Sequence, residues 1–219
     1  MIKLNEYGRS MIEMLGVLAI VGVLSVGGIA GYSKAMTNYK MNKLLSEYVE
    51  FFTDVIRHKE DWFYEHKKRN PESYANNSLF RISNFLDDVI DLPNGWSGDG
   101  EENMGVYDSL GGIVYAYVRK PYVQFDIFLS VSGASKMDLG NKIKCRMILS
   151  RLMNEFVDDL YWVAMYQNAQ RKTDYLYGNK YCGVDGKKCY SSITLADINS
   201  MCEIPIDDVG GLAITIKMN

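Results

Sequence analysis

Residues 14–33 read MLGVLAIVGVLSVGGIAGYS and contain no charged side chain. A helix needs about 20 mostly apolar residues to cross the hydrocarbon core of a bilayer. This stretch has that length, and its glycines would let neighbouring membrane helices approach closely. The same glycines weaken a helix, so local melting on assembly is a further hypothesis. We therefore predict a membrane-spanning helix near the start of the chain.

The residues before and after this stretch are unlike those of a cleaved secretory signal. Residues 1–8, MIKLNEYG, carry Lys3 and Glu6; Arg9 follows, and Glu13 stands at the start of the apolar run. No A-x-A site with a polar mature start comes after the run. A plain signal anchor, with Glu13 near the membrane interface, is one interpretation of this pattern.

The helical pattern continues beyond the apolar run. No proline occurs between Met1 and Asn70, and apolar side chains recur at three- and four-residue steps. These side chains are Tyr39, Leu44, Leu45, Tyr48, Val49, Phe51, Phe52, Val55 and Ile56. One continuous helix from about Ser10 to about His66 is the simplest prediction, with half of it in lipid and half packed on a domain.

The composition limits what the rest of the chain can be. With 219 residues, 47% hydrophobic and 23% charged, the chain has room for one globular domain plus an extra element. The slightly negative mean hydropathy excludes a multi-span membrane protein. The net charge of −3 provides no basic field for wrapping nucleic acid, so no nucleic-acid partner is predicted.

The four cysteines all lie in the C-terminal third of the chain. They are Cys145, Cys182, Cys189 and Cys202. Clustered cysteines behind a membrane-targeting segment favour disulfides formed in an oxidising compartment. A zinc site is the competing interpretation, but no pair has C-x-x-C spacing and both histidines lie far upstream. Four cysteines allow three pairings, and the spacing alone does not choose among them.

Catalytic and metal-binding motifs are missing from the sequence. His58 and His66 lack the HExxH pattern, and there is no GxSxG, P-loop or GxGxxG. Four side chains could offer oxygen ligands to calcium: Asp99, Glu101, Glu102 and Asn103. They do not fit the EF-hand spacing, so a solvated loop is favoured. We therefore expect no enzyme activity, no cofactor and no metal.

The remaining two thirds of the chain predict a small antiparallel sheet with helices. After a charged break at residues 67–73, we expect elements at these positions: a helix over 78–91, a hairpin of strands 113–119 and 122–131, a helix over 138–165, and a last strand over 210–217. The last strand is expected to join the hairpin. Alternate residues of the second hairpin strand should face the long helix, namely Val123, Phe125, Ile127, Leu129 and Val131. The fold class expected is thus α+β.

The stretch GRSMIEML, Gly8 to Leu15, resembles the processing site of type IV pilins and the related pseudopilins of type II secretion. The resemblance implies cleavage after Gly8 by a prepilin peptidase, methylation of the new terminus at Arg9, and an assembly role for Glu13, fifth in the mature chain. The family usually starts with phenylalanine, methionine or leucine, and this chain departs from that at Arg9. The implied division is a leader at 1–8, a transmembrane and assembly stem at 9–33, and an extracytoplasmic head at 34–219.

A physical role for Glu13 agrees with this implication. A carboxylate inside a membrane helix costs about 2.5–3.5 kcal/mol and therefore usually has a partner. Cleavage would create an α-amino group with a pKa of about 7.7–8.0, which is mostly protonated at neutral pH. At 4 Å the two charges attract by about 4 kcal/mol at an effective dielectric of 20, before desolvation is subtracted. Such a pair would fix the register between neighbouring subunits.

The head is similar to that of type IVb pilins. The similarity rests on Leu92-Pro93 before a glycine-rich loop, Gly111-Gly112 before a strand, Cys145 on a helix, and Cys202 before the last strand. It implies disulfides Cys145–Cys202 and Cys182–Cys189. The long loop closed by the first would stabilise the domain by roughly 4 kcal/mol.

The resemblance implies a pilin-like structural subunit of a filament. Its implied partners are copies of itself, the prepilin peptidase, an inner-membrane assembly platform, and membrane lipid before assembly. The precursor would cross the bacterial inner membrane once, with its head in the periplasm, before entering an extracellular or periplasmic filament. Two alternatives stay open: a pseudopilin of a type II secretion system, and a signal-anchored periplasmic enzyme or binding protein.

Overall fold

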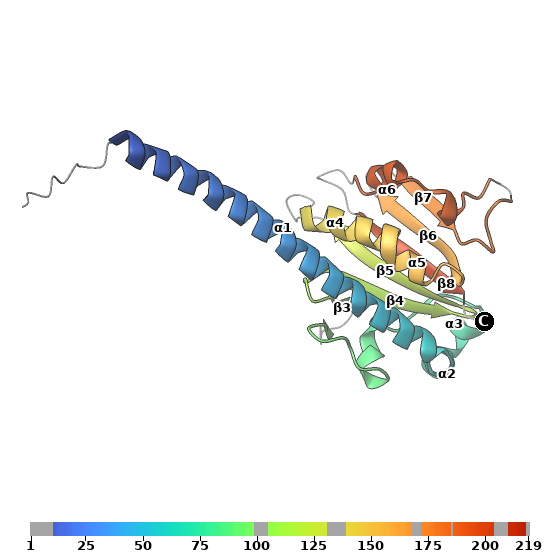
Figure 1. The fold of residues 1–219 in the computed structure, drawn as a ribbon. Coiled ribbons are helices and arrows are strands. Elements are labelled where there is room, and N and C mark those ends of the chain that lie inside the picture. The colour runs from blue at the N-terminus through green and yellow to red at the C-terminus, as the bar shows by residue number, and fades with distance from the viewer. Residues whose placement is uncertain are drawn as a thin grey trace, which may run out of the picture. The chain divides into compact units, whose positions relative to one another are not determined.

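A computed structural model describes residues 11–98, 105–130, 139–167, 172–184, 186–203 and 210–217. The fold is α+β, with a long N-terminal helix, an antiparallel sheet and several further helices (Figure 1). The chain divides into two compact units after Asn42. The first unit is helical throughout its described part, and the second contains the sheet.

The predicted helix over residues 10–66 is present but interrupted once. Helix α1 spans Met11–Arg57 and α2 spans Lys59–Arg69. At His58 between them the backbone leaves helical values, with φ −90° and ψ 25°. The buried Trp62 indole donates a hydrogen bond of 2.8 Å to the carbonyl of Val55. The Val55 carbonyl lies in the last turn of α1, where carbonyl groups have no backbone N–H partner within the helix, and the Trp62 indole provides one.

The break expected at residues 67–73 is confined to Asn70, because α2 continues to Arg69 and a short helix that was not predicted begins at Pro71. Helix α3 spans Pro71–Ala75, and the Asn70 side chain accepts a hydrogen bond of 3.1 Å from the backbone of Ser73. Proline in the first helical turn and asparagine at the cap are both favoured by the geometry of a helix start.

The strands of the described sheet pair antiparallel in the order β2-β3-β4-β5-β8-β6-β7, and β1 also pairs with β4. The strands are β1 Phe80–Arg81, β2 Ser97–Gly98, β3 Val106–Tyr107, β4 Ile113–Arg119, β5 Tyr122–Ser130, β6 Leu160–Gln167, β7 Lys172–Tyr177 and β8 Gly210–Lys217. The predicted hairpin is confirmed as β4 and β5, and the predicted last strand, β8, pairs with β5 as expected.

The helix predicted over residues 78–91 is wrong. The chain there forms strand β1 and then a 3-10 helix over Ser83–Asp88. The Ser83 hydroxyl accepts a hydrogen bond of 2.7 Å from the backbone N–H of Ala116, and Phe80 pairs with Val118 of β4. These contacts with a distant strand override the local helical pattern.

The helix predicted over residues 138–165 is correct only in its first part. Helix α4 spans Leu139–Met147, continues as a π-helical segment over Ile148–Leu152, and ends as α5 at Met153–Glu155. Residues 160–167 instead form β6, which lies between β8 and β7. A short apolar run fits either a buried helix or a buried strand, and pairing on both sides decides for the strand.

Three further elements after β6 were not predicted. Strand β7 pairs with β6, a 3-10 turn covers Tyr190–Ser192, and helix α6 spans Leu195–Met201. A capping box starts α6: the Thr194 side chain accepts from the backbone of Asp197, and the Asp197 carboxylate accepts from the backbone of Thr194.

The core of the second unit lies between the sheet and the end of α1. The Phe52 ring stacks on Phe125 of β5 at a centroid distance of 3.8 Å, and both are fully buried. Alternate residues of β5 are buried as expected, namely Val123, Phe125, Ile127 and Leu129. Val131 lies outside the described residues. The expectation that this face of β5 packs on the long helix is confirmed at Phe125, whose ring contacts Phe51 and Phe52 of α1.

Candidate assembly segment and disulfide region

The first unit presents apolar side chains on every side of α1. The exposed fractions of its large apolar side chains between Met14 and Ile29 run from 52% to 74%. A helix that is apolar all round and not buried within its own protein requires lipid or other helices as its surroundings. The helix starting at Glu13 is long and apolar enough to cross a membrane, and it is the only such helix in the described chain. A single-pass anchor is consistent with this finding.

Glu13 lies in the first turn of α1 and is exposed. A carboxylate there interacts favourably with the positive end of the helix dipole. No other charged residue follows before Lys34, so Glu13 is the acidic group closest to the apolar run. The predicted processing residues Gly8 and Arg9 lie outside the described residues.

The glycines of this segment have no packing partner within the described chain. A Cβ added at Gly16, Gly22, Gly27, Gly28 or Gly31 would meet no atom within 4 Å. Nothing within the chain's own fold therefore requires these positions to lack a side chain. Close approach of another helix remains a prediction that fits these positions.

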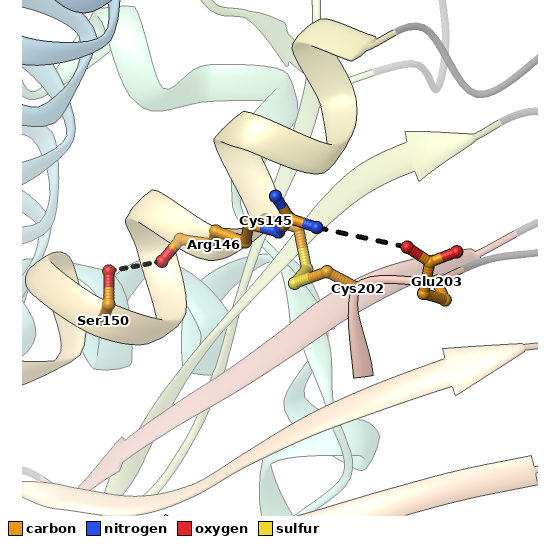
Figure 2. The surroundings of a disulfide bond; sticks show 5 residues. All are labelled: Cys145, Arg146, Ser150, Cys202 and Glu203. Atoms are coloured by element: carbon orange, nitrogen blue, oxygen red, sulfur yellow. Dashed lines mark hydrogen bonds and ion pairs between the residues drawn. A yellow bond between two sulfur atoms is a disulfide. The ribbon is translucent and has the colours of Figure 1, made fainter. Parts of the chain in front are cut away.

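The four cysteines form two disulfides, in the pairing that the resemblance implies. Figure 2 shows Cys145 on α4 joined to Cys202 at the end of α6, with a Cα–Cα distance of 5.8 Å. The second bond joins Cys182 to Cys189 across a Cα–Cα distance of 4.9 Å. Because no cysteine is free, the zinc interpretation has no thiolate to use.

Ion pairs surround the first disulfide. The carboxylate of Glu203, next to Cys202, lies 2.9 Å from the amine of Lys142. It also lies 4.0 Å from a guanidinium nitrogen of Arg146 (Figure 2). The hydrogen bond from Lys142 lowers the pKa of Glu203. All three side chains are at least partly exposed, so these pairs contribute little beyond the covalent link.

Comparisons with protein-family models, with curated proteins and with solved structures found no match.

A buried ion pair in the second unit was not predicted. The amine of Lys144 on α4 contacts the carboxylate of Asp108, and both side chains are almost fully buried. Asp108 also accepts hydrogen bonds of 2.8 Å from the Tyr48 hydroxyl and 2.9 Å from each backbone N–H of Leu110 and Gly112. Burial lowers the pKa of the Lys144 amine, and attraction to Asp108 opposes that change. The charge on Asp108 is thus well supported by hydrogen-bond donors.

This ion pair joins three segments that are distant in sequence. Tyr48 is on α1, Asp108 is in the loop after β3, and Lys144 is on α4, next to Cys145 of the disulfide. Burial and the neighbouring Asp108 raise the pKa of Tyr48, which keeps its hydroxyl protonated as a donor. A Cβ at Gly112 would overlap the Lys144 amine and the Asp108 carboxylate. The absence of a side chain at Gly112 therefore leaves room for the ion pair.

Glu47, the neighbour of Tyr48, holds the same loop at a second point. Its carboxylate accepts hydrogen bonds of 2.5 Å from the Ser109 hydroxyl and 3.1 Å from the Trp96 indole. The Trp96 ring lies between Tyr48 and Phe51, at centroid distances of 5.1 and 4.8 Å. Glu47 thus links α1 to the loop at Ser109 and to the segment at Trp96, and the Trp96 ring also packs against α1.

The described part of the chain contains no cluster of side chains that could bind a metal ion. No group of three histidine, cysteine or carboxylate side chains could hold an ion there. The His66 ring stacks on Phe80 at 4.4 Å, and a nitrogen of His58 lies 2.9 Å from the carbonyl of Asp54, so both histidines have structural contacts. The loop residues 99–103, considered for calcium, lie outside the described residues.

Proposed function

We propose that the chain is a structural subunit of a type IV pilus-like filament, processed after Gly8 and polymerised through its N-terminal helix. The observation that carries the proposal is the composition of α1. One uninterrupted helix contains an apolar segment with a single carboxylate at its start, and continues into a segment that is packed on a sheet. A simple anchor does not require that continuity or that carboxylate.

The contacts of the second unit hold the C-terminal part of α1 against a loop and the sheet, which suits a subunit that assembles through this helix. Tyr48 and Glu47 attach α1 to the loop before β4, and Phe52 attaches it to β5. The Cys145–Cys202 disulfide holds α4 beside the end of α6. A subunit that assembles through α1 needs the part of this helix within the second unit to be held firmly in that unit.

Replacing Glu13 by glutamine is expected to prevent filament formation while the chain still enters the membrane. The substitution removes the charge that would pair with the amine of a neighbouring subunit. Loss of a charge-assisted contact worth about 1.5–3 kcal/mol weakens each subunit contact roughly tenfold to a hundredfold. The measurement is an immunoblot of the filament fraction sheared from cells, beside the membrane fraction.

The matched control is Glu50→Gln, the same chemical change at an exposed position of α1 outside the apolar segment. This variant should assemble like the parent chain. Parental amounts of sheared filament from Glu13→Gln would overturn the assembly role. A parent chain that stays in the membrane and periplasm, without surface filaments, would favour the pseudopilin alternative.

A further inference from the structure

The His66 side chain joins three short elements of the second unit. It lies on α2 and is 1% exposed. Its ring stacks on the Phe80 ring of β1 at a centroid distance of 4.4 Å, with an interplanar angle of 3°. The Tyr74 ring of α3 meets it edge-on at 5.3 Å, and its Nε2 lies 3.1 Å from the hydroxyl oxygen of Ser73 on the same helix. One histidine thus contacts both of the elements that follow α2 in the chain.

The other nitrogen of this ring is buried without a hydrogen bond. Nδ1 of His66 has no partner in the described part of the chain. The neutral tautomer with its proton on Nε2 satisfies the ring best, because that N–H can donate to Ser73 while Nδ1 keeps a bare lone pair. A proton added at Nδ1 would create a buried donor that has no acceptor.

The described charged side chains on the elements around His66 either pair with one another, lie over other rings or are exposed. They are Glu65, Lys67, Lys68 and Arg69 of α2, Glu72 of α3, Arg81 of β1, Asp88 of the 3-10 helix, and Arg119 of β4. The titratable group in contact with the ring is the phenol of Tyr74, which is uncharged at neutral and acid pH. An imidazolium at His66 would therefore be buried and unpaired, which is the costly case for a charged group.

The segment that covers His66 is short. Helix α3 has five residues, and β1 pairs with β4 through two residues. The amides of Tyr74 and Ser78 donate to the carbonyls of Asn70 and Ser73, within the segment itself. A helix of this length is not stable alone in water, so these hydrogen bonds depend on the contacts with α2. Opening of residues 70–81 therefore costs less than unfolding of the whole unit.

We propose that residues 70–81 form an acid-sensitive segment, in which protonation of His66 releases α3 and β1 from α2 while the rest of the second unit stays folded. The released segment uncovers the rings of Tyr74 and Phe80 and the face of α2 that carries His66. The proposal does not depend on whether the chain enters a filament.

The direction of this pH dependence follows from proton binding. In the opened segment the His66 ring is solvated and takes up a proton with the ordinary pKa of about 6.5. In the closed segment burial lowers that pKa, so the opened form binds more protons in the window below about 6.5. The ratio of opened to closed segments therefore rises as the pH falls through this window, by up to about tenfold per pH unit, and levels off below the pKa of the closed form.

A buried carboxyl on the sheet responds to acid in the opposite direction. Burial raises the pKa of Asp126 on β5. A carboxyl whose pKa is raised in the folded state binds more protons there than in the unfolded chain, so acid stabilises the fold around it. Opening of residues 70–81 at low pH is therefore not the effect expected from Asp126.

The test is hydrogen exchange of the full chain in detergent micelles at pH 7.5 and pH 5.5, with each rate corrected for the intrinsic effect of pH on exchange. The equilibrium constant for opening at the amides of Tyr74 and Ser78 should rise about fivefold to tenfold at pH 5.5. The amides of Ile127 and Ile214, in the paired strands β5 and β8, should keep their protection.

Two pairs of variants assign the effect to the His66 ring. His66→Phe keeps an aromatic ring against Phe80 but takes up no proton, so the difference between the two pH values should disappear. His58→Phe makes the same change at the only other histidine of the chain, and this variant should keep the parental difference. Should His66→Phe misfold, Ser73→Asp places a carboxylate beside Nε2 and should remove most of the acid opening, whereas Ser73→Asn, of the same size, should keep it.

Three results would overturn the proposal. The first is equal opening of Tyr74 and Ser78 at both pH values in the parent chain. The second is a pH difference that survives in His66→Phe or in Ser73→Asp. The third is a loss of protection at Ile127 and Ile214 together with Tyr74, which would mean that acid unfolds the whole unit.

Discussion

Replacing Lys144 by methionine is expected to lower the free energy of unfolding by about 3–5 kcal/mol, because the change leaves the buried Asp108 carboxylate without its counter-charge. Methionine keeps most of the length of the lysine side chain, so the expected loss of stability comes from removing the charge and not from creating a cavity. The measurement is urea unfolding of the full chain in detergent, followed by tryptophan fluorescence. Trp62 and Trp96 are buried in the second unit and report its unfolding.

The same substitution two residues earlier provides the control. Lys142 pairs with Glu203, but the Glu203 side chain is 59% exposed, so Lys142→Met should change the free energy of unfolding by less than about 1 kcal/mol. Equal effects of the two substitutions would contradict the assignment of Lys144–Asp108 as a buried link between α1, the loop and α4.

Removing the Cys145–Cys202 disulfide with a double alanine variant is expected to cost about 4 kcal/mol, since its cysteines are 57 positions apart and the bond restricts a long loop in the unfolded chain. The Cys182–Cys189 pair is separated by 7 positions, and its double alanine variant should lose about 2 kcal/mol. Unfolding in urea under non-reducing conditions compares the two variants directly.

The discriminating result is which of the two double alanine variants loses more free energy of unfolding. A larger loss from the short loop would mean that its bond acts through native packing near β7 rather than through chain entropy. The comparison also bears on strand β7, because Cys189 holds the bridge to Tyr177. In the short-loop variant, exchange at Tyr177 should become faster than the loss of about 2 kcal/mol of global stability alone explains.

The elements that could be predicted from sequence have strong local patterns. The apolar run after Glu13 is uniform over its whole length, and β4 and β5 alternate on either side of Lys120-Pro121. The burial of each element sets this periodicity, so the pattern can be recognised in the sequence without knowing the tertiary structure. The interruption at His58 was missed because the bond from Trp62 to Val55 is not visible in a residue pattern.

The mistaken helix over residues 138–165 has a different cause. Val163, Ala164 and Met165 are consecutive buried residues of β6, so this strand lacks the polar alternation that would distinguish it from a helix. Its pairing with β8 and β7 decides its structure. Strand β1 was missed because it has only two residues and depends on β4. Both errors arise where tertiary pairing decides the local structure.

The buried pair of Lys144 and Asp108 could not be found by spacing, since its members are 36 positions apart. One signal was present: Lys144 stands four residues before Ile148 and eight before Leu152, on the apolar stripe of its helix. A lysine on such a stripe requires a buried partner. Gly112, which makes room for that partner, is explained only by the assembled site.

The measurement that tests the central claim most directly is the intact mass and N-terminal sequence of the chain purified from its own membrane. A processed filament subunit should begin at Arg9 and lack residues 1–8, and the Gly8→Ala variant should keep them. A chain that begins at Met1 in both cases, or one cut after the apolar run, would contradict the account.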